Sequence, residues 1–224
     1  LVGRSLFVVV PYLNKNKINN KLLYVDSDIL YPLFGFIIFG NGLFIINTLL
    51  PIDSIYVVIF VALLIIPAIT KAKLFSRSLN LNNLNIKFFL YYLAIPSLLV
   101  ISTFDIAFNY DAGYYHLLHQ NWLRNSNLII GMVNIFWPFG MSSIYEYVSA
   151  FLWFDTSFVL LHFINLFFIH FFYLFLGENI TASKNKYLVN SSLFVLFFSL
   201  LDNFGLGGGR NGYIYIQGVT KQDV

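Results

Sequence analysis

Residues 30–50 read Leu-Tyr-Pro-Leu-Phe-Gly-Phe-Ile-Ile-Phe-Gly-Asn-Gly-Leu-Phe-Ile-Ile-Asn-Thr-Leu-Leu, a run without any charged side chain. About 20 mainly apolar helical residues are enough to cross the hydrocarbon core of a bilayer. Further uncharged runs follow along the chain, at 54–70, 88–104, 156–176 and, somewhat shorter, 187–201. Together they predict an all-α, polytopic bundle of transmembrane helices, with residues 1–224 forming a single integral-membrane domain.

The composition agrees with a membrane environment. Hydrophobic residues make up 58% of the 224 residues and charged residues only 10%, with a formal net charge of +3, whereas about a quarter of the residues of a soluble domain are charged. Because charge runs are missing, a nucleic-acid-binding surface and an acidic disordered tail are excluded. The absence of cysteine excludes disulfides, thiolate metal sites and thiol nucleophiles. The lipid bilayer is therefore the main expected partner.

The chain begins with Leu and ends, after a loop, with Lys221-Gln-Asp-Val224. We therefore expect it to be a fragment of a longer protein.

Basic residues predict the orientation, since they favour the cytoplasmic side of short loops. They cluster before the first run, between the second and third, and before the last: Lys15, Lys17, Lys21; Lys71, Lys73, Arg77, Lys87; Lys184, Lys186. This distribution places the loop at 177–186 inside and residues 105–155 and 202–224 outside. Residues 141–154 are too short to span, so we expect them to lie along or dip into the outer surface.

The outer segment after the third run contains an unusual concentration of polar groups. Asp105, Asp111, His116, His119 and Arg124 lie within 20 residues of an otherwise apolar chain. From Asp111, which occupies an N-cap position, an apolar stripe and a polar stripe recur at helical spacing. The apolar stripe consists of Tyr114, Leu117, Leu118 and Trp122, and the polar stripe of His116, His119, Gln120 and Arg124. The pattern predicts an amphipathic helix in the headgroup region on the outer face.

Simpler interpretations of these residues stay open. Asp111 can be a helix cap without any catalytic role, and Arg124 can contact a lipid phosphate. His116 and His119 can supply ordinary interfacial polarity, because two histidines do not make a metal site.

The following stretch, 129–143, is interrupted by Gly131, Pro138 and Gly140, so it cannot form one continuous membrane helix. It could line a site for a lipid-linked ligand. Glu146, farther along, should face protein or water, because a carboxylate facing lipid is costly.

These elements together resemble the first external loop of GT-C-type polytopic membrane glycosyltransferases, and more narrowly an uncharacterised bacterial branch of that superfamily. The resemblance rests on the run Asp111-Ala-Gly-Tyr-Tyr-His116-Leu, then Trp122-Leu, Gly131-Met-Val-Asn134 and Phe139-Gly140-Met-Ser-Ser143. It implies transfer of a sugar from a polyprenyl phosphate to an acceptor at the outer face of a bacterial inner membrane. It also implies that Asp111 is the catalytic base and Asp105 a second acidic group, able to hold a divalent metal if the reaction needs one.

In this superfamily the second external loop usually contributes an acidic residue and groups that contact phosphate. The resemblance implies that Asp202 and Arg210 take these places in the second outer loop. That loop also contains a formal G-x-G-x-x-G at Gly207, Gly209 and Gly212, but a preceding membrane run in place of a strand excludes a dinucleotide fold. Either a phosphate-binding nest or a flexible turn fits this sequence. The resemblance thus gives His116, His119, Arg124, Asp202 and Arg210 as candidates for binding substrate or phosphate.

Two other functional classes remain open. A transporter or lipid flippase would need polar groups along a path through the membrane, for which only His162, Asn165 and His170 are suitable. A polysaccharide polymerase or ligase would also use external loops, but it usually relies on Arg and His without a catalytic Asp. The sugar and the acceptor are not identified by the sequence.

Overall fold

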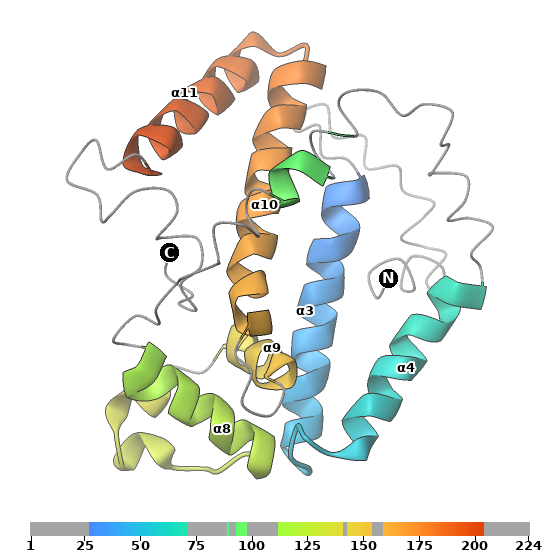
Figure 1. Cartoon of the computed structure of the whole chain (residues 1–224), viewed down its shortest axis with the longest axis vertical. Coiled ribbons are helices and arrows are strands. Elements are labelled where there is room, and N and C mark those ends of the chain that lie inside the picture. Colours follow the sequence, from blue (N-terminus) through green and yellow to red (C-terminus); the bar gives the residue numbers. More distant parts are fainter. Residues whose placement is uncertain are drawn as a thin grey trace. The chain divides into compact units, whose positions relative to one another are not determined.

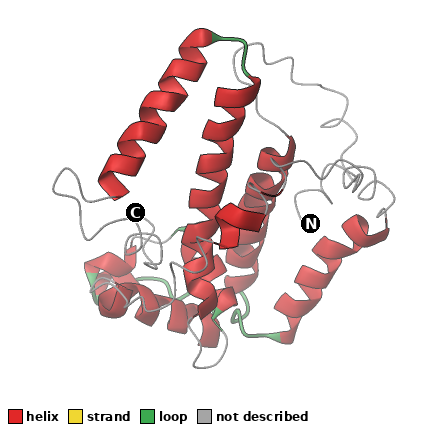
Figure 2. Cartoon of the chain, turned by 45° about the horizontal axis from the view of Figure 1, so that its top comes forward, coloured by secondary structure: helices red, strands yellow, loops and turns green. Residues whose placement is uncertain are grey.

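A computed structural model describes residues 27–70, 89, 93–97, 112–140, 143–153 and 159–203. These residues form helices and connecting turns, with no strand among them (Figure 2). The all-α prediction is therefore confirmed for the described part of the chain. The third expected span, 88–104, falls mostly outside it.

The chain divides into two compact units. One contains Leu1–Lys15, Tyr31–Ser78 and Phe108–Leu161, and the other contains Asn16–Leu30, Leu79–Ala107 and His162–Val224. Every candidate site residue whose side chain is described belongs to the first unit.

The first unit is built on two apolar helices, α3 (Ser27–Asn47), which belongs to it from Tyr31 onward, and α4 (Ile55–Thr70) (Figure 1). They match the predicted runs 30–50 and 54–70 closely. Glycine allows other elements to approach α3 closely: a Cβ at Gly40 would lie 2.9 Å from the Ile144 Cβ, and one at Gly42 would clash with the Phe60 ring. Gly42 thereby permits the packing of α4 against α3.

The short elements of this unit follow from Ala112 onward. A π-helical turn, η3 (Ala112–His116), leads into α8 (Leu117–Asn125). Two 3₁₀ turns, η4 (Met132–Asn134) and η5 (Trp137–Gly140), come next, and Gly131 precedes them with φ +89°. The prediction that 129–143 is not a continuous helix is thus confirmed, since a left-handed glycine and a proline interrupt it.

Helix α9 (Ile144–Leu152) completes the unit and packs against α3. Phe39 contacts Phe151 edge-on at 5.1 Å between ring centroids, and Phe44 contacts Tyr147 at 5.3 Å. A helix of this length measures about 14 Å, well short of a bilayer core. Whether 141–154 lies along the outer surface stays a prediction.

The turn between α3 and α4 is fixed to the end of α8 by Asn47, which is fully buried. Its Nδ2 donates to the carbonyls of Leu123 at 3.0 Å, Ser126 at 3.0 Å and Leu50 at 3.2 Å. Its own carbonyl accepts the Leu128 amide at 2.7 Å. One side chain thus satisfies carbonyls that the end of a helix leaves unpaired.

Substituting Asn47→Ala is expected to destabilise the protein by about 1 to 3 kcal/mol, because buried carbonyls lose their donor. Asn47→Asp should cost more, since a carboxylate would face the same carbonyls. Chemical unfolding in detergent measures both changes, with Lys184→Gln, at an exposed position, as control. Equal stability of the wild type and Asn47→Asp would show that this residue does not hold the turn.

The second unit contains α10 (Val159–Ala182) and α11 (Lys186–Asn203). Asn185 begins α11 by accepting the Tyr187 amide on its Oδ1 at 3.0 Å. The predicted loop 177–186 was too long, because helix continues to Ala182 and leaves only Ser183–Asn185 as the turn. Asn179 and Thr181 lie in the last turns of α10, and each bonds its side chain to a carbonyl one turn earlier.

One helical stretch of the described residues, Phe163–Ala182, is long and apolar enough to cross a membrane. Three other described helices have apolar stretches that are shorter: Tyr31–Asn47, Ile55–Pro67 and Lys186–Ser199.

Candidate functional site

The structure describes only part of the predicted site. Asp105, Asp111 and Arg210 lie outside the described residues. Asp202 belongs to the last turn of α11, but its side chain is not described. His116, His119 and Arg124 are all described, and they fall into two separate environments.

The first environment is a group of buried polar side chains formed by His116, His119, Gln120 and Glu146, referred to below as the Glu146 cluster. Glu146 lies in the first turn of α9 and is fully buried. One of its carboxylate oxygens bonds the His116 Nδ1, and the other accepts the Gln120 Nε2 at 2.8 Å. The expectation that Glu146 faces protein or water is confirmed, since it faces protein.

The π-helical turn before α8 matters for this arrangement. Turns of this type alter the side-chain register of a helix and are frequent at functional sites. Here η3 ends at His116, and α8 continues with His119 and Gln120 on the same buried side. Glu146 thus receives donors from two positions one turn apart.

His119 is 5% exposed and its ring lies near that of Phe139, with 6.2 Å between centroids. Burial lowers its pKa from the ordinary value of 6.5, and the nearby His116 lowers it further, while Glu146 opposes the shift. Desolvation is the largest of these effects. The imidazole is therefore neutral at neutral pH.

This lowered pKa predicts a pH-dependent stability. The unfolded protein binds a proton at His119 more readily than the folded protein, so stability is fully present above about pH 6.5 and decreases as the pH falls through the lower folded value. Melting temperatures measured between pH 8 and pH 5 should therefore fall, and His119→Gln should weaken the dependence. An unchanged slope in that variant would assign the effect to other groups.

The cluster also affects its neighbour Tyr145. Burial, followed by the charge of Glu146, raises the pKa of this phenol far above neutrality. Tyr145 consequently remains a neutral hydroxyl.

One atom of the cluster remains able to bind another group. The Gln120 Oε1 is buried and has no hydrogen-bond partner among the described residues, although buried polar atoms are almost always paired. The Gln120 side chain can therefore accept a hydrogen bond while the geometry of the cluster stays fixed.

The helix from Ala112 to Asn125 is amphipathic, as predicted, but the polar stripe faces the interior. His116, His119 and Gln120 are buried, whereas Tyr114 is 51% exposed and Leu118 42% exposed. This face is buried because the buried carboxylate of Glu146 requires hydrogen-bond donors from inside the protein. An exposed apolar stripe suits contact with lipid.

The second environment contains Arg124, in the last turn of α8. Its Cζ lies 5.3 Å from the centroid of the Trp153 ring, within the range of a cation–π contact. Arg124 therefore does not join His116 and His119, and it lines a separate pocket described below.

The resemblance makes Asp105 a candidate ligand for a divalent metal. Within the described ranges, no group of three or more His, Asp or Glu side chains is arranged to hold a metal ion. Asp105 itself lies outside those ranges, so its predicted role stays a prediction.

Comparison with protein-family models, with curated proteins and with solved structures gave no match. The resemblance to GT-C-type enzymes therefore stays a prediction from the motifs.

Sequence reasoning named the polar stripe of α8 but not its partnership with Glu146. A signal was available, because Glu146 is the only acidic residue between 112 and 154. A lone carboxylate in an apolar segment needs donors, and the nearest polar stripe is that of α8. Asp53, which lines the Arg124 pocket, was not singled out.

Proposed function

We propose that this chain is part of a multi-pass membrane glycosyltransferase of GT-C type. It moves a sugar from a polyprenyl phosphate to an acceptor hydroxyl on the outer face of a bacterial inner membrane. The acceptor is a glycan, a lipid or a protein.

The observation that supports this function best is the position of the Glu146 cluster. Asp111, the proposed base, directly precedes η3, whose His116 side chain is held by Glu146. The chain after Asp111 is therefore anchored, and the Gln120 Oε1 is an unpaired acceptor in the same segment. Fixed neighbouring groups increase the efficiency of a catalytic base, because little reorganisation is needed during reaction.

Large apolar side chains exposed on several described helices support the multi-pass membrane location. A soluble monomer rarely exposes so much contiguous apolar surface. On α11, for example, the exposed large apolar residues are Tyr187, Leu193, Phe194, Val195, Phe197 and Phe198.

In the proposed reaction, the Asp111 carboxylate takes the proton of the acceptor hydroxyl while that oxygen attacks the anomeric carbon. The bond from this carbon to the phosphate oxygen breaks, its electron pair leaves with the polyprenyl phosphate, and the configuration inverts. The phosphate gains negative charge and needs a cationic partner. Arg210, Arg124 and a divalent ion bound by Asp105 are the candidates for this role.

Membranes containing the full-length protein test the proposal. Supplied with a panel of polyprenyl phosphates bearing radiolabelled pentoses or hexoses, they should move label from one donor to a different product. Membranes without the protein are the control, and Lys184→Gln is a matched variant at an exposed position. If label crosses the bilayer without cleavage of the sugar–phosphate bond, a flippase is the correct assignment.

A further inference from the structure

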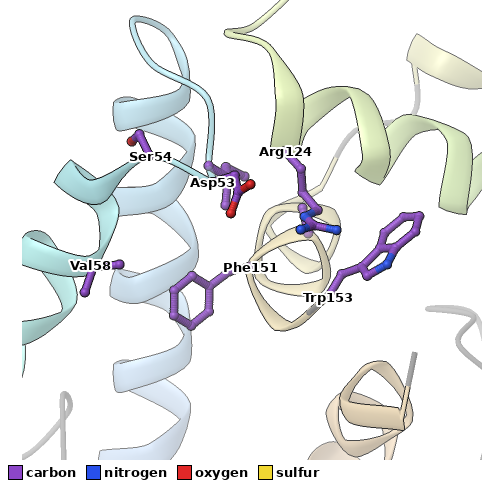
Figure 3. Close-up of a pocket in the computed structure, with 8 residues that line it drawn as sticks. Asp53, Ser54, Val58, Arg124, Phe151 and Trp153 are labelled. Carbon is purple, nitrogen blue, oxygen red and sulfur yellow. The ribbon is translucent and has the colours of Figure 1, made fainter. Parts of the chain in front are cut away.

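The Arg124 pocket is a cavity of about 330 Å³ in the first unit, formed by the α3–α4 turn, the end of α8 and the end of α9 (Figure 3). Asp53, Ser54, Val58, Arg124, Phe151 and Trp153 are among its lining residues. The volume is at the small end of the range for ligand sites. It therefore suits a compact polar group.

The pocket is held in shape by the backbone. Asp53 N donates to the Arg124 carbonyl at 3.2 Å, and Ile52 N donates to the Leu123 carbonyl at 3.1 Å. The turn that bears Asp53 is thereby fixed to the helix that bears Arg124.

The two walls have opposite charges. In Figure 3 the Asp53 carboxylate and the Arg124 guanidinium face one another across the pocket. No ion pair between them is found in the described part of the chain. Trp153 orients the guanidinium by its cation–π contact, which leaves the N–H groups of Arg124 available to an anion.

Ser54 adds an uncharged polar group next to Asp53. Its Oγ is buried and has no hydrogen-bond partner among the described residues. An oxygen of this kind is well suited to accept a hydrogen bond from a ligand.

A group with a phosphate and a primary ammonium fits this arrangement. The phosphate oxygens match the N–H fork of Arg124. The ammonium has three N–H donors, which match the Asp53 carboxylate and the Ser54 hydroxyl. A trimethylammonium group cannot donate hydrogen bonds, and a headgroup without a cation offers the Asp53 carboxylate no charge of opposite sign.

An apolar track leads away from the pocket along α4. Its exposed residues lie on one helical face, and Val58 belongs both to this face and to the pocket lining. The members of the track are Ile55, Val58, Ile59, Leu63 and Ile66, exposed by 48–64%. Acyl chains next to this face would remain in contact with apolar side chains, which favours a lipid over a free solute.

We propose that the Arg124 pocket binds the headgroup of a phospholipid bearing phosphoethanolamine, with its acyl chains along α4. The inference does not depend on the proposed glycosyl transfer. It assigns Arg124 to a bound lipid, and so leaves Arg210 as the arginine for the leaving phosphate in that reaction.

Native mass spectrometry of the full chain tests the proposal. After delipidation, the protein is given equal amounts of phosphatidylethanolamine, phosphatidylcholine and phosphatidylglycerol with identical acyl chains. Phosphatidylethanolamine should be retained about tenfold more than either competitor, the factor that one good hydrogen-bonded contact provides. Soluble glycerophosphoethanolamine should compete only weakly. Equal retention of the three lipids would overturn the proposal, and preferential retention of phosphatidylglycerol would indicate a site for anionic lipids instead.

Single substitutions test the contributions of Asp53 and Arg124 to lipid binding separately. Asp53→Asn should abolish the preference for ethanolamine over choline, whereas Arg124→Gln should reduce retention of all three lipids. Lys184→Gln, which removes an exposed cation that is not among the lining residues of the pocket, should leave retention unchanged. A similar loss in Lys184→Gln would show that only general charge attraction is measured, against the proposal.

Melting temperatures distinguish the loss of the lipid site from a loss of stability of the fold. Without lipid, Asp53→Asn should melt at the wild-type temperature, because this carboxylate is exposed and makes no ion pair with Arg124. Added phosphatidylethanolamine should then stabilise only the wild type. If Asp53→Asn melts lower by the same amount with and without lipid, the two residues merely stabilise the fold and the lipid site is refuted.

Discussion

Replacement of Asp111 by Asn is expected to lower sugar transfer about 100- to 10,000-fold, the usual contribution of a catalytic base. Asn has nearly the same size and is an equally good helix cap. Expression and membrane insertion of the full-length variant should therefore stay normal. Initial rates of transfer, measured at equal amounts of inserted protein, check the prediction.

Asp105→Asn is the matched comparison, because it removes the other carboxylate of the same segment. It should cause a smaller defect, or one that depends on the divalent metal concentration. If Asp111→Asn transfers sugar at the wild-type rate, the carboxylate only caps a helix and the catalytic assignment must be abandoned.

Glu146→Leu is expected to destabilise the first unit by about 3 to 5 kcal/mol, the usual effect of removing one partner from a buried polar pair. Glu146 is fully buried, and the substitution leaves both His116 and Gln120 without their acceptor. Glu146→Gln keeps the shape and one acceptor, so its cost should be smaller, about 1 to 3 kcal/mol. Chemical unfolding in detergent measures both variants.

The double variant Glu146→Gln with Gln120→Glu provides a rescue. In it, the carboxamide at position 146 can accept from His116 and donate to the new carboxylate on α8. It should therefore recover part of the stability lost by Glu146→Gln alone. If all three variants are as stable as the wild type, the Glu146 cluster does not hold α8 and α9 together.

The helices of long apolar runs could be predicted from the sequence, because their formation depends on local composition. The bounds of α3, α4 and α11 lie close to the runs 30–50, 54–70 and 187–201. The end of α10 was missed because Lys184 and Lys186 predicted an inside loop at 177–186, whereas the helix continues to Ala182.

The site could be predicted less well, because its contacts join residues far apart in the chain. Glu146 meets Gln120 across 26 residues and His116 across 30. Helical periodicity reveals that His116, His119 and Gln120 share a face, but not whether that face is turned inward. The face is turned inward because Glu146, the lone carboxylate on α9, accepts hydrogen bonds from it.

The Arg124 pocket depends on an even longer connection. Asn47 joins the α3–α4 turn to the end of α8 across 76 residues, and this brings Asp53 opposite Arg124. In the sequence, Asp53 is only one polar residue between two apolar runs.

All of the proposed chemistry requires that the chain crosses the membrane several times and leaves residues 105–155 on the outer surface. Single cysteines test this directly, because the protein has none of its own. In intact cells, a membrane-impermeant thiol reagent should label Asn109→Cys and Asn211→Cys, but not Asn82→Cys or Asn185→Cys. Labelling at Asn185 without labelling at Asn211 would contradict the proposed topology, because residues 141–154 would then have to form a true span.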